Sequence, residues 1–439
     1  MNDITSVQSF GTHTQHGYLK QLLKGSVYIF KGFVPALWNA LLVYLSQQIS
    51  YRLILRFSPT SIVYPVEKSI ESAATKVIFL CSTRNSKQQI CIKLWQPCAN
   101  GLYDTLDRQK RLDYLLEGLE LNSRFAPGVC YGVAPIVDRK HTIQLGNLIS
   151  KPDKVKLNPK NEYALVMKRL DESWRLDEQL KNGFGRRSGI KFIAREIAAM
   201  HRLLDEQPQA NEGNLESIRS KLLLNLRFLN KALDELRTKN LKLKRPIMIA
   251  NYERIGSVMY QAFTALADSF DLHPIRRCHG DLKAANLWIR PANGKRSCQL
   301  LALDCVDFNP AFCFIDTLSD VAMLAVDIEA LSDDGQTDDQ KKQSGQKRVR
   351  WFLNAYLEAT HENDKDTAWM LLEFYLTEKA IVHAYMNIVF DGFPIIGLKY
   401  LNIAMKHAEQ LEKKVKALST LSLSHTGTFK QKQLIGQSI

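Results

Sequence analysis

The chain has 439 residues, of which 45% are apolar, a composition typical of a soluble globular protein with room for two or three domain-sized units. Its eight cysteines form no Cys-x-x-Cys pair and mostly lie in apolar runs, which excludes a disulfide framework or a zinc site and predicts a cytoplasmic protein. The net charge of +14 is concentrated in residues 1–60 and 406–439, and no basic helix is interleaved with aromatic residues, so nucleic acid is not expected as the main ligand.

Residues 1–60 are predicted to form an N-terminal helical extension. Residues 1–24 are polar and have no Arg-rich run before an apolar core, so a secretory signal is not expected. The apolar run 33–45 is interrupted by Pro35 and Asn39 and is shorter than the ~20 residues of a membrane span. Apolar residues at helical spacing from Trp38 onward instead predict an amphipathic helix. This helix either packs on the body of the protein or contacts a membrane surface, aided by flanking Lys and Arg residues.

Beyond residue 61 the pattern changes from strands to helices. Period-two segments predict strands at 77–80 and 89–94, with further strands at 134–137 and 163–167 and a helix at 107–122 between these pairs. After residue 169 the pattern is mainly helical. The predicted fold class is therefore α+β, with a small antiparallel-sheet unit at 61–168, a larger helical unit at 169–418 and a flexible tail at 419–439.

The segment 278–289 (CHGDLKAANLWI) carries the residues with the clearest chemistry. A turn signal at 291–294 (PANG) separates two apolar runs, which predicts a hairpin. If the turn is centred near residue 295, Asn286 faces Asp304 across the ladder, and antiparallel partners lie ~5 Å apart. A carboxamide oxygen and a carboxylate would then converge at the open end of the hairpin, an arrangement that suits Mg²⁺.

Asp281 precedes Asn286 by five residues, which is the spacing of the catalytic Asp and the metal-binding Asn in a kinase catalytic loop. Upstream, Lys93 is charged in the middle of an apolar strand. Kinases use a lysine in such a strand to pair with the α- and β-phosphates, although a solvent-facing lysine on an amphipathic strand has the same pattern. Together these residues predict phosphoryl transfer from a magnesium nucleotide.

The motif His-Gly-Asp-Leu-x3-Asn at 279–286, followed by segments 303–309 and 315–322, resembles the Brenner loop of aminoglycoside phosphotransferases and choline kinases. It is most similar to a poorly characterised bacterial branch of aminoglycoside-phosphotransferase-like proteins. The resemblance extends from about Ser72 to Gly392 and is dense in motifs only at 276–330. Many of these enzymes have His after Asp-Leu, whereas this chain has Lys283, as Ser/Thr protein kinases do.

The resemblance implies a two-lobed protein-kinase-like fold that binds ATP and Mg²⁺. In this hypothesis Asp281 accepts the proton of an acceptor hydroxyl or orients that hydroxyl. Asn286 and Asp304 hold Mg²⁺, Lys93 neutralises the α- and β-phosphates, and Lys283 reaches the γ-phosphate.

Two further features of the nucleotide site follow from the resemblance. There is no Gly-x-Gly-x-x-Gly loop, so the turn at 71–76, with its small residues Ser72 and Thr75, is predicted to cover the phosphates. Glu117 and Glu120 share one face of the helix 107–122, and one of them is expected to pair with Lys93. The resemblance favours Glu117.

The resemblance also suggests roles for residues of the hinge between the lobes and for residues that support the catalytic loop. Val166 and Met167 lie in a segment similar to the hinge, whose main-chain groups would hold adenine. His201 ends a long central helix and is interpreted as a structural hydrogen-bonding residue, while Asp320 resembles the buried aspartate that braces the catalytic loop.

The predicted function is ATP- and Mg²⁺-dependent phosphorylation of a hydroxyl group on a small molecule. Aminoglycosides are not favoured as acceptors, because acidic residues are not concentrated in the helices of the acceptor side. A catalytically inactive ATP-binding scaffold is one alternative. A protein kinase is another, suggested by Lys283, although nothing resembles Asp-Phe-Gly or Ala-Pro-Glu.

Overall fold

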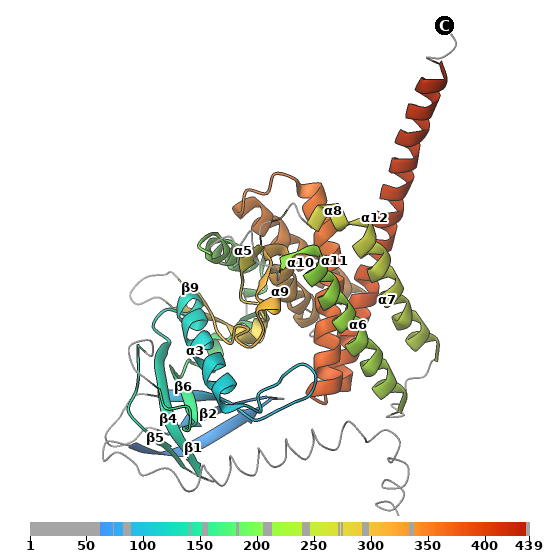
Figure 1. The fold of residues 1–439 in the computed structure, drawn as a ribbon. Helices are drawn as coiled ribbons and strands as arrows, with labels where there is room; N and C mark the ends of the chain where they lie inside the picture. Colours follow the sequence, from blue (N-terminus) through green and yellow to red (C-terminus); the bar gives the residue numbers. More distant parts are fainter. Residues whose placement is uncertain are drawn as a thin grey trace, which may run out of the picture.

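A computed structural model of the chain describes residues 62–435, apart from 73, 82–88, 140–141, 152–156, 181–183, 205–212, 239–245, 271–272, 274, 292–297 and 333–337 (Figure 1). The predicted extension at 1–60, including its amphipathic helix, lies outside the described residues. The chain forms a sheet-based lobe followed by a larger helical lobe, which is the predicted α+β arrangement.

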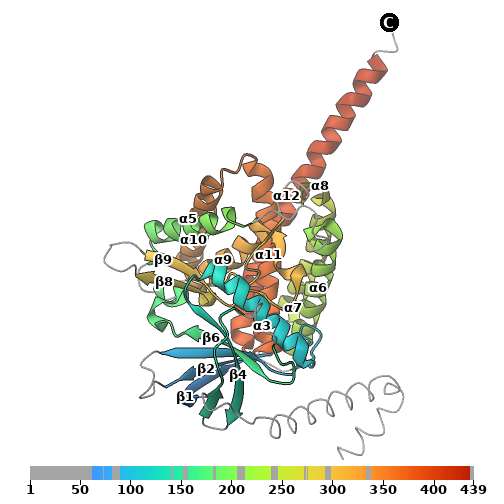
Figure 2. The same cartoon turned by 60° about the vertical axis from the view of Figure 1, so that its left-hand side comes forward.

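The N-terminal lobe is an antiparallel sheet in the order β1-β2-β3-β6-β4-β5, and it closes on itself because β1 pairs with both β2 and β5 (Figure 2). Its strands are β1 (Ile62–Glu71), β2 (Thr75–Leu80), β3 (Ile90–Trp95), β4 (Cys130–Arg139), β5 (Thr142–Leu145) and β6 (Tyr163–Lys168). Alternate residues such as Ile78, Ile92 and Ile143 fill its interior, as the period-two pattern predicts. The predicted strands at 77–80, 134–137 and 163–167 fall within β2, β4 and β6, and the one predicted at 89–94 corresponds to β3, which begins at Ile90.

Helix α3 (Arg108–Phe125) lies between this sheet and the helical lobe (Figure 2). Asp107 caps its first turn by accepting a hydrogen bond from Lys110 N at 3.0 Å. The helix buries Leu112 and Leu115 against sheet residues that include Val133. This packing fixes which face of α3 points toward the sheet and which points toward the second lobe.

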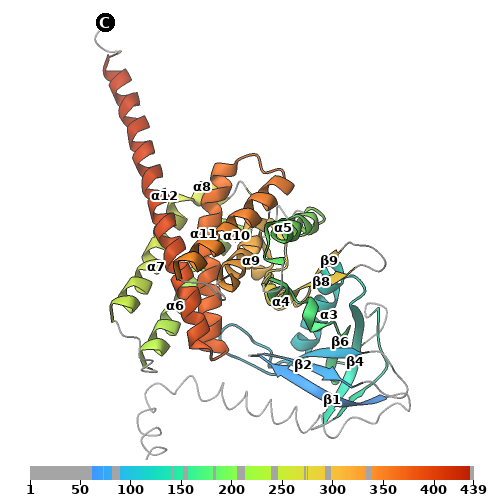
Figure 3. The same cartoon turned by 180° about the vertical axis from the view of Figure 1, so that it is seen from behind.

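The C-terminal lobe is mainly helical and contains two short two-stranded sheets. Its helices are α4 (Leu176–Gln179), α5 (Arg187–Arg202), α6 (Leu215–Thr238), α7 (Pro246–Ala265), α8 (Ala267–Phe270), α9 (Thr317–Leu331), α10 (Asp338–Ala359), α11 (Lys365–Tyr385) and α12 (Pro394–Ile435). Its strands are β7 (Ile275–Arg277), β8 (Leu287–Pro291), β9 (Cys298–Ala302) and β10 (Phe314–Asp316). Figure 3 shows α6, α7 and α12 side by side on the flank away from the sheet.

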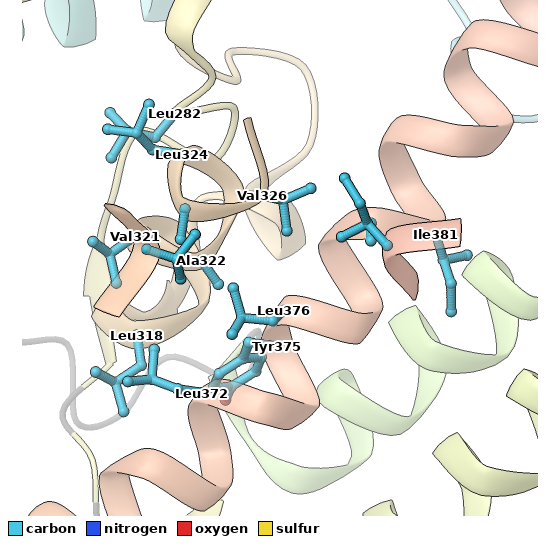
Figure 4. Close-up of a cluster of buried hydrophobic side chains, with 14 of the residues drawn as sticks. Leu282, Leu318, Val321, Ala322, Leu324, Val326, Leu372, Tyr375, Leu376 and Ile381 are labelled. Carbon is cyan, nitrogen blue, oxygen red and sulfur yellow. The ribbon is translucent and has the colours of Figure 1, made fainter. Parts of the chain in front are cut away.

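One large hydrophobic core holds the C-terminal lobe together and includes part of the loop at 279–286. Leu282, which follows Asp281, is 2% exposed and belongs to the same core as Val321 of α9 and Leu376 of α11 (Figure 4). Burying a leucine side chain contributes about 1.5–3 kcal/mol. Burial of Leu282 therefore anchors the middle of the loop and holds the polar residues on either side of it in place.

The last helix, α12, continues to Ile435, beyond the boundary at residue 418 expected from the sequence. Its final turns project away from the body of the protein (Figure 1). Within the described residues, no helix combines the length and apolar character that crossing a membrane requires.

Candidate active site

The loop at 279–286, which carries the predicted catalytic Asp281, begins where β7 ends, and β7 pairs with β10 just before α9. Gly280 has a φ of +80°, and a Cβ atom there would lie 2.6 Å from the main-chain oxygen of Phe312. Both the left-handed backbone and the close approach require glycine. The Gly280 turn places Asp281 between the two lobes, on the wall of a cavity.

Asp320, near the start of α9, braces this loop, as predicted. Its carboxylate accepts hydrogen bonds from the main-chain nitrogens of His279 and Gly280 at 3.1 and 2.9 Å. His201 Nε2 lies 3.2 Å from the same carboxylate, and His201 Nδ1 lies 2.7 Å from the Tyr356 hydroxyl. His201 thus has the structural hydrogen-bonding role that its position suggested.

A second aspartate of α9 supports the loop two turns later and was not predicted. Asp327 accepts hydrogen bonds from Ala284 N at 2.8 Å and from the Tyr400 hydroxyl at 2.7 Å. A signal was present in the sequence, because residues seven apart lie on one face of a helix and Asp327 follows Asp320 by seven. One helix face therefore fixes both the start and the end of the catalytic loop.

One carboxylate oxygen of Asp281 is held by two side chains. Asp281 Oδ2 accepts hydrogen bonds from Lys283 Nζ at 2.8 Å and from Asn286 Nδ2 at 2.9 Å. In the described part of the chain, Asp281 Oδ1 has no hydrogen-bond partner. Burial opposes the charge of Lys283, but the carboxylate of Asp281 outweighs it and raises the pKa of the Lys283 amine. The loop thus presents one free, oriented carboxylate oxygen.

The predicted hairpin is present, but its register differs by one residue from the prediction. Leu287 pairs with Ala302, and the main-chain nitrogen of Leu303 donates to Asn286 O at 2.9 Å. Asn286 therefore lies opposite Leu303 and not opposite Asp304. The expected facing pair is wrong because the loop between the strands is centred half a residue earlier than residue 295.

Asp304 nevertheless turns toward the cavity, because its backbone leaves the strand direction with a φ of +62°. Non-glycine residues rarely adopt this conformation, and aspartate is among the more tolerant. The main-chain nitrogen of Asp304 donates to Asn122 Oδ1 of α3 at 2.7 Å, which fixes the turn. Asn122 was not predicted, and nothing in its sequence context indicated this role.

Lys93 of β3 forms ion pairs with two carboxylates from the segment after β9. Its Nζ lies 2.6 Å from Asp304 Oδ1 and 3.4 Å from Asp307 Oδ2. Burial disfavours the charge of Lys93, but the two aspartates outweigh it and raise its pKa. The surrounding lobes partly shield the half-exposed Asp304 from water, which opposes its ionisation, yet Lys93 and Lys283 hold its pKa below the usual range. Lys93 thus lies at the sheet side of the cavity, facing Asp304, the predicted metal ligand.

Asp307 differs from Asp304 in its surroundings. Its side chain is 3% exposed, whereas that of Asp304 is 51% exposed. Burial therefore raises the pKa of Asp307 to about 6, with the attraction of Lys93 acting in the opposite direction. A Cβ atom at Gly118 of α3 would lie 2.5 Å from Asp307 Oδ2, so glycine at position 118 makes room for this carboxylate.

The expected pairing of Lys93 with Glu117 is wrong in this structure. Glu117 forms an ion pair with Arg277 of β7, and Glu120 lies 3.5 Å from the same guanidinium group. The rotation of α3 directs Gly118, and not either glutamate, toward the carboxylate of Asp307, which is the partner of Lys93. The carboxylates that neutralise Lys93 come instead from residues 304 and 307.

A cavity of about 450 Å³ connects these groups between the lobes, a size within the range of small-molecule sites. Ser72 and Thr75 lie on its wall, where their hydroxyl groups are 2.7 Å apart. The predicted hinge residues are not on this wall. Val166 and Met167 lie inside β6, whose two sides pair with β3 and β4, so their main-chain groups belong to the sheet.

The oxygen donors at the open end of the hairpin fit a hard divalent cation. The amide nitrogen of Asn286 donates a hydrogen bond to Asp281, which turns the amide oxygen of Asn286 away from that carboxylate. The half-exposed carboxylate of Asp304 lies on the cavity wall. Magnesium ions bind through one or two such protein oxygens together with substrate phosphates, so this donor set is compatible with a magnesium nucleotide.

Structural comparisons give three representative matches. A choline kinase from Cryptosporidium parvum Iowa II has a TM-score of 0.46 at 12% identity, covering 87% of this chain and 98% of that chain. An ethanolamine kinase from Plasmodium vivax has a TM-score of 0.43 at 12% identity, covering 91% and 95%. Aminoglycoside 2'-phosphotransferase-IIIa, solved as its GDP complex, has a TM-score of 0.42 at 12% identity, covering 85% and 98%.

The structural neighbours of this chain are small-molecule kinases. No protein-family model and no curated protein sequence matches the chain.

Proposed function

We propose that the protein is a phosphotransferase that moves the γ-phosphoryl group of ATP, with Mg²⁺, to a hydroxyl group of a small molecule. Asp281, Asp304 and Lys93 line one cavity, and the buried Asn286 is hydrogen-bonded to Asp281 beside it, which supports this proposal most directly. Side chains from two lobes, Lys93 and Asp304, which are 211 positions apart, meet there. A purely structural cluster has no need of a free carboxylate oxygen beside an open cavity.

Asp281 acts on the acceptor in this proposal. Its unbonded Oδ1 accepts the proton of the attacking hydroxyl as the oxygen–phosphorus bond forms and the bond from the γ-phosphorus to the bridging oxygen of ADP breaks. Lys283 and Asn286 hold the other oxygen and so fix the direction of Oδ1. General-base participation of this kind contributes about 10²–10⁴-fold to the rate.

The nucleotide side is assigned to residues that the cavity brings together. Asn286 and Asp304 would hold Mg²⁺, which neutralises charge on the transferred phosphoryl group. Lys93 would pair with the α- and β-phosphates, and Ser72 and Thr75 would cover the phosphates from β1 and β2. Lys283 is close enough to Asp281 to be a second cation near the γ-phosphate. The eight cysteines, all free thiols, are compatible with a cytoplasmic site of action.

The test uses the full chain, Mg·ATP and a panel of hydroxyl compounds, with ADP release as the readout. Asp281→Asn is expected to lower turnover by about 10²–10⁴-fold while leaving the thermal shift produced by Mg·ATP unchanged. The matched control is Asp234→Asn, which removes an exposed carboxylate on α6 and should retain the wild-type rate.

Two outcomes contradict the proposal in different ways. Wild-type turnover in Asp281→Asn would remove this residue from the chemistry. Mg·ATP binding without ADP release from the wild-type protein, across the panel, would instead favour the catalytically inactive scaffold.

A further inference from the structure

Beyond Asp281, the cavity continues between α6 and α11, on the side opposite the sheet. Lys221 and Asn225 of α6 are four residues apart and both lie on its wall. Glu378, Lys379 and Tyr385 of α11 contribute the facing wall. If phosphoryl transfer occurs at Asp281, this half of the cavity is where the acceptor binds, because the nucleotide takes the half next to the sheet.

The charged groups of this wall are paired, with one half-buried exception, Lys221, and one exposed exception, Asp391. Glu378 lies 3.3 Å from Lys379 Nζ and accepts a hydrogen bond from Asn225 Nδ2 at 3.0 Å. Among the cavity-lining charged groups of the described chain, Lys221 and Asp391 alone have no hydrogen bond or ion pair. Asp391 is exposed, so water can solvate its carboxylate. Lys221 is half-buried, so water solvates its ammonium group less fully.

The environment of Lys221 disfavours its positive charge. Burial is the main cause and lowers the pKa of its amine to about 8, and Lys379 acts in the same direction. Glu378 and Asp316 attract the ammonium group from beyond ion-pair distance and only partly offset this effect. An ammonium group in such a position is costly until an anion reaches it.

Rearrangement of the wall does not easily supply that anion. Asn225 Oδ1 accepts a hydrogen bond from the Tyr385 hydroxyl at 3.0 Å, while its amide nitrogen holds Glu378. A swing of Glu378 toward Lys221 would break its contacts with both Asn225 and Lys379. The free position beside Lys221 therefore faces the cavity and is open to a ligand.

We propose that the acceptor carries an anionic oxygen group, a carboxylate or a phosphate, that pairs with Lys221 while its hydroxyl group lies at Asp281. This inference rests on the proposed function and narrows its substrate class to hydroxyl-bearing acids and phosphate esters. Cationic acceptors are disfavoured, because Glu378 and the other buried carboxylates of this cavity already have partners within the protein.

A stability comparison of the free protein tests the premise without a substrate. Lys221→Met should leave the melting temperature unchanged or raise it, because it removes an unpaired charge. Lys379→Met, the matched control, should lower the melting temperature by about 2–4 °C, since it leaves Glu378 without its ion-pair partner. An equal fall in Lys221→Met would show that Lys221 already serves the fold as a paired charge, and the proposal would be overturned.

Ligand protection tests the binding itself and does not require turnover. The rate of reductive methylation of Lys221, followed by peptide mass spectrometry, is measured without ligand and with inorganic phosphate, D-gluconate, D-glucose or choline. The expected result is at least fivefold slower methylation with gluconate or phosphate and no change with glucose or choline. Protection by gluconate alone assigns a carboxylate, and protection by phosphate alone assigns a phosphate. Protection by choline, or by neither anion, would overturn the proposal.

An activity panel then separates this proposal from the proposed function. Matched triplets of a sugar, its sugar acid and its sugar phosphate are tested for ADP release. Phosphorylation of the anionic members, with an acceptor KM at least tenfold higher in Lys221→Met and an unchanged KM for ATP, supports the inference. Phosphorylation of only neutral or cationic compounds overturns it while leaving the proposed function intact. Absence of all ADP release contradicts the proposed function, and the methylation result then decides the anion site alone.

Discussion

Lys93 and Lys221 line the same cavity but stand in opposite electrostatic situations. Lys93 lies within ion-pair distance of Asp304 and Asp307, and these carboxylates raise its pKa. Among the residues that the structure describes, Lys221 has no partner within that distance, and burial lowers its pKa to about 8. One side of the cavity therefore supplies its own counter-charges, whereas the other side leaves a cation for a ligand to neutralise.

The contrast suits the two ligands that the proposed function requires. The nucleotide arrives with Mg²⁺, so the site must offer both carboxylates for the metal and a cation for the phosphates. In the free protein these groups neutralise one another. An anionic acceptor arrives without a metal, and a single unpaired cation is enough to receive it. The five predictions below test this contrast, from the largest expected effect to the smallest.

Removal of Lys93 is expected to have the largest effect on the nucleotide side. Lys93→Met leaves Asp307 buried without its cation, and breaking a buried ion pair costs up to about 3–5 kcal/mol of unfolding free energy. The loss of unfolding free energy is smaller where Asp307 can take up a proton and become neutral. Binding of Mg·ATP should weaken by about 10–100-fold, the value of a charge-assisted hydrogen bond. Denaturant unfolding and calorimetric titration measure the two effects, and unchanged nucleotide affinity would contradict the assignment of Lys93.

The second prediction concerns the partner of Lys93. Asp307→Ala should weaken Mg·ATP binding by about 10–100-fold, as loss of a residue that orients a ligand-binding side chain does. Adding Gly118→Asp should restore most of this affinity, because the new Cβ would start 2.5 Å from the position of the lost Asp307 oxygen. The combined substitution would place a helix-borne carboxylate beside Lys93, as protein kinases do.

The control for that rescue is Gly118→Asn in the Asp307→Ala background, which has the same shape without the charge and should not restore binding. Gly118→Asp alone should be impaired, since its side chain would collide with Asp307. Equal affinities in the Asp and Asn double variants would show that Asp307 serves packing and not the charge of Lys93.

The third prediction is a pH dependence. The folded-state pKa of Asp307 is about 6 and lies above its ordinary value of 3.8, so the folded protein binds the extra proton more tightly than the unfolded chain does. The contribution of Asp307 to stability is therefore most favourable at low pH, and it declines as pH rises from about 4 to 6. Asp307→Asn should remove this decline, as denaturant unfolding at pH 4.5, 5.5 and 7 would show. An identical decline in the variant would assign it to another group.

The fourth prediction applies the same logic to Lys221. Its folded-state pKa of about 8 lies below the ordinary 10.5, so the unfolded chain holds the proton more tightly. Its contribution should therefore increase stability as pH rises from about 8 to 10.5. Lys221→Met should abolish that increase, measured as melting temperature at pH 7.5, 8.5 and 9.5, whereas Lys379→Met should retain it.

The sequence predicted those parts of the site that depend on local spacing. Asp281 and Asn286 share one short loop, so their spacing in the chain largely fixes their contact at 2.9 Å. The bracing role of Asp320 was also predictable, since it follows a recognisable motif. The hairpin was expected, but a shift of half a residue in the centre of its loop changed the register and the facing pair.

Tertiary packing decided what local spacing could not. Asp304 meets Lys93 because of a left-handed turn held by Asn122, a contact between residues 182 positions apart. Helical periodicity placed Glu117 and Glu120 on one face of α3 but gave no information on which way that face points. Packing of α3 on the sheet turned Gly118 toward Asp307, the buried partner of Lys93. Lys221 gave no signal at all, because an isolated lysine on an amphipathic helix is ordinary.

The smallest expected effect comes from changing Glu117. This test checks that Asp304 and Asp307, and not the glutamate of α3, are the partners of Lys93. Glu117 is 39% exposed and pairs with Arg277, so Glu117→Gln should cost at most about 1 kcal/mol of stability. The dissociation constant for Mg·ATP should stay within twofold of the wild-type value, measured beside Asp307→Ala under the same conditions. A tenfold weakening in Glu117→Gln would mean that nucleotide binding rotates α3 and exchanges Asp307 for Glu117 as the partner of Lys93.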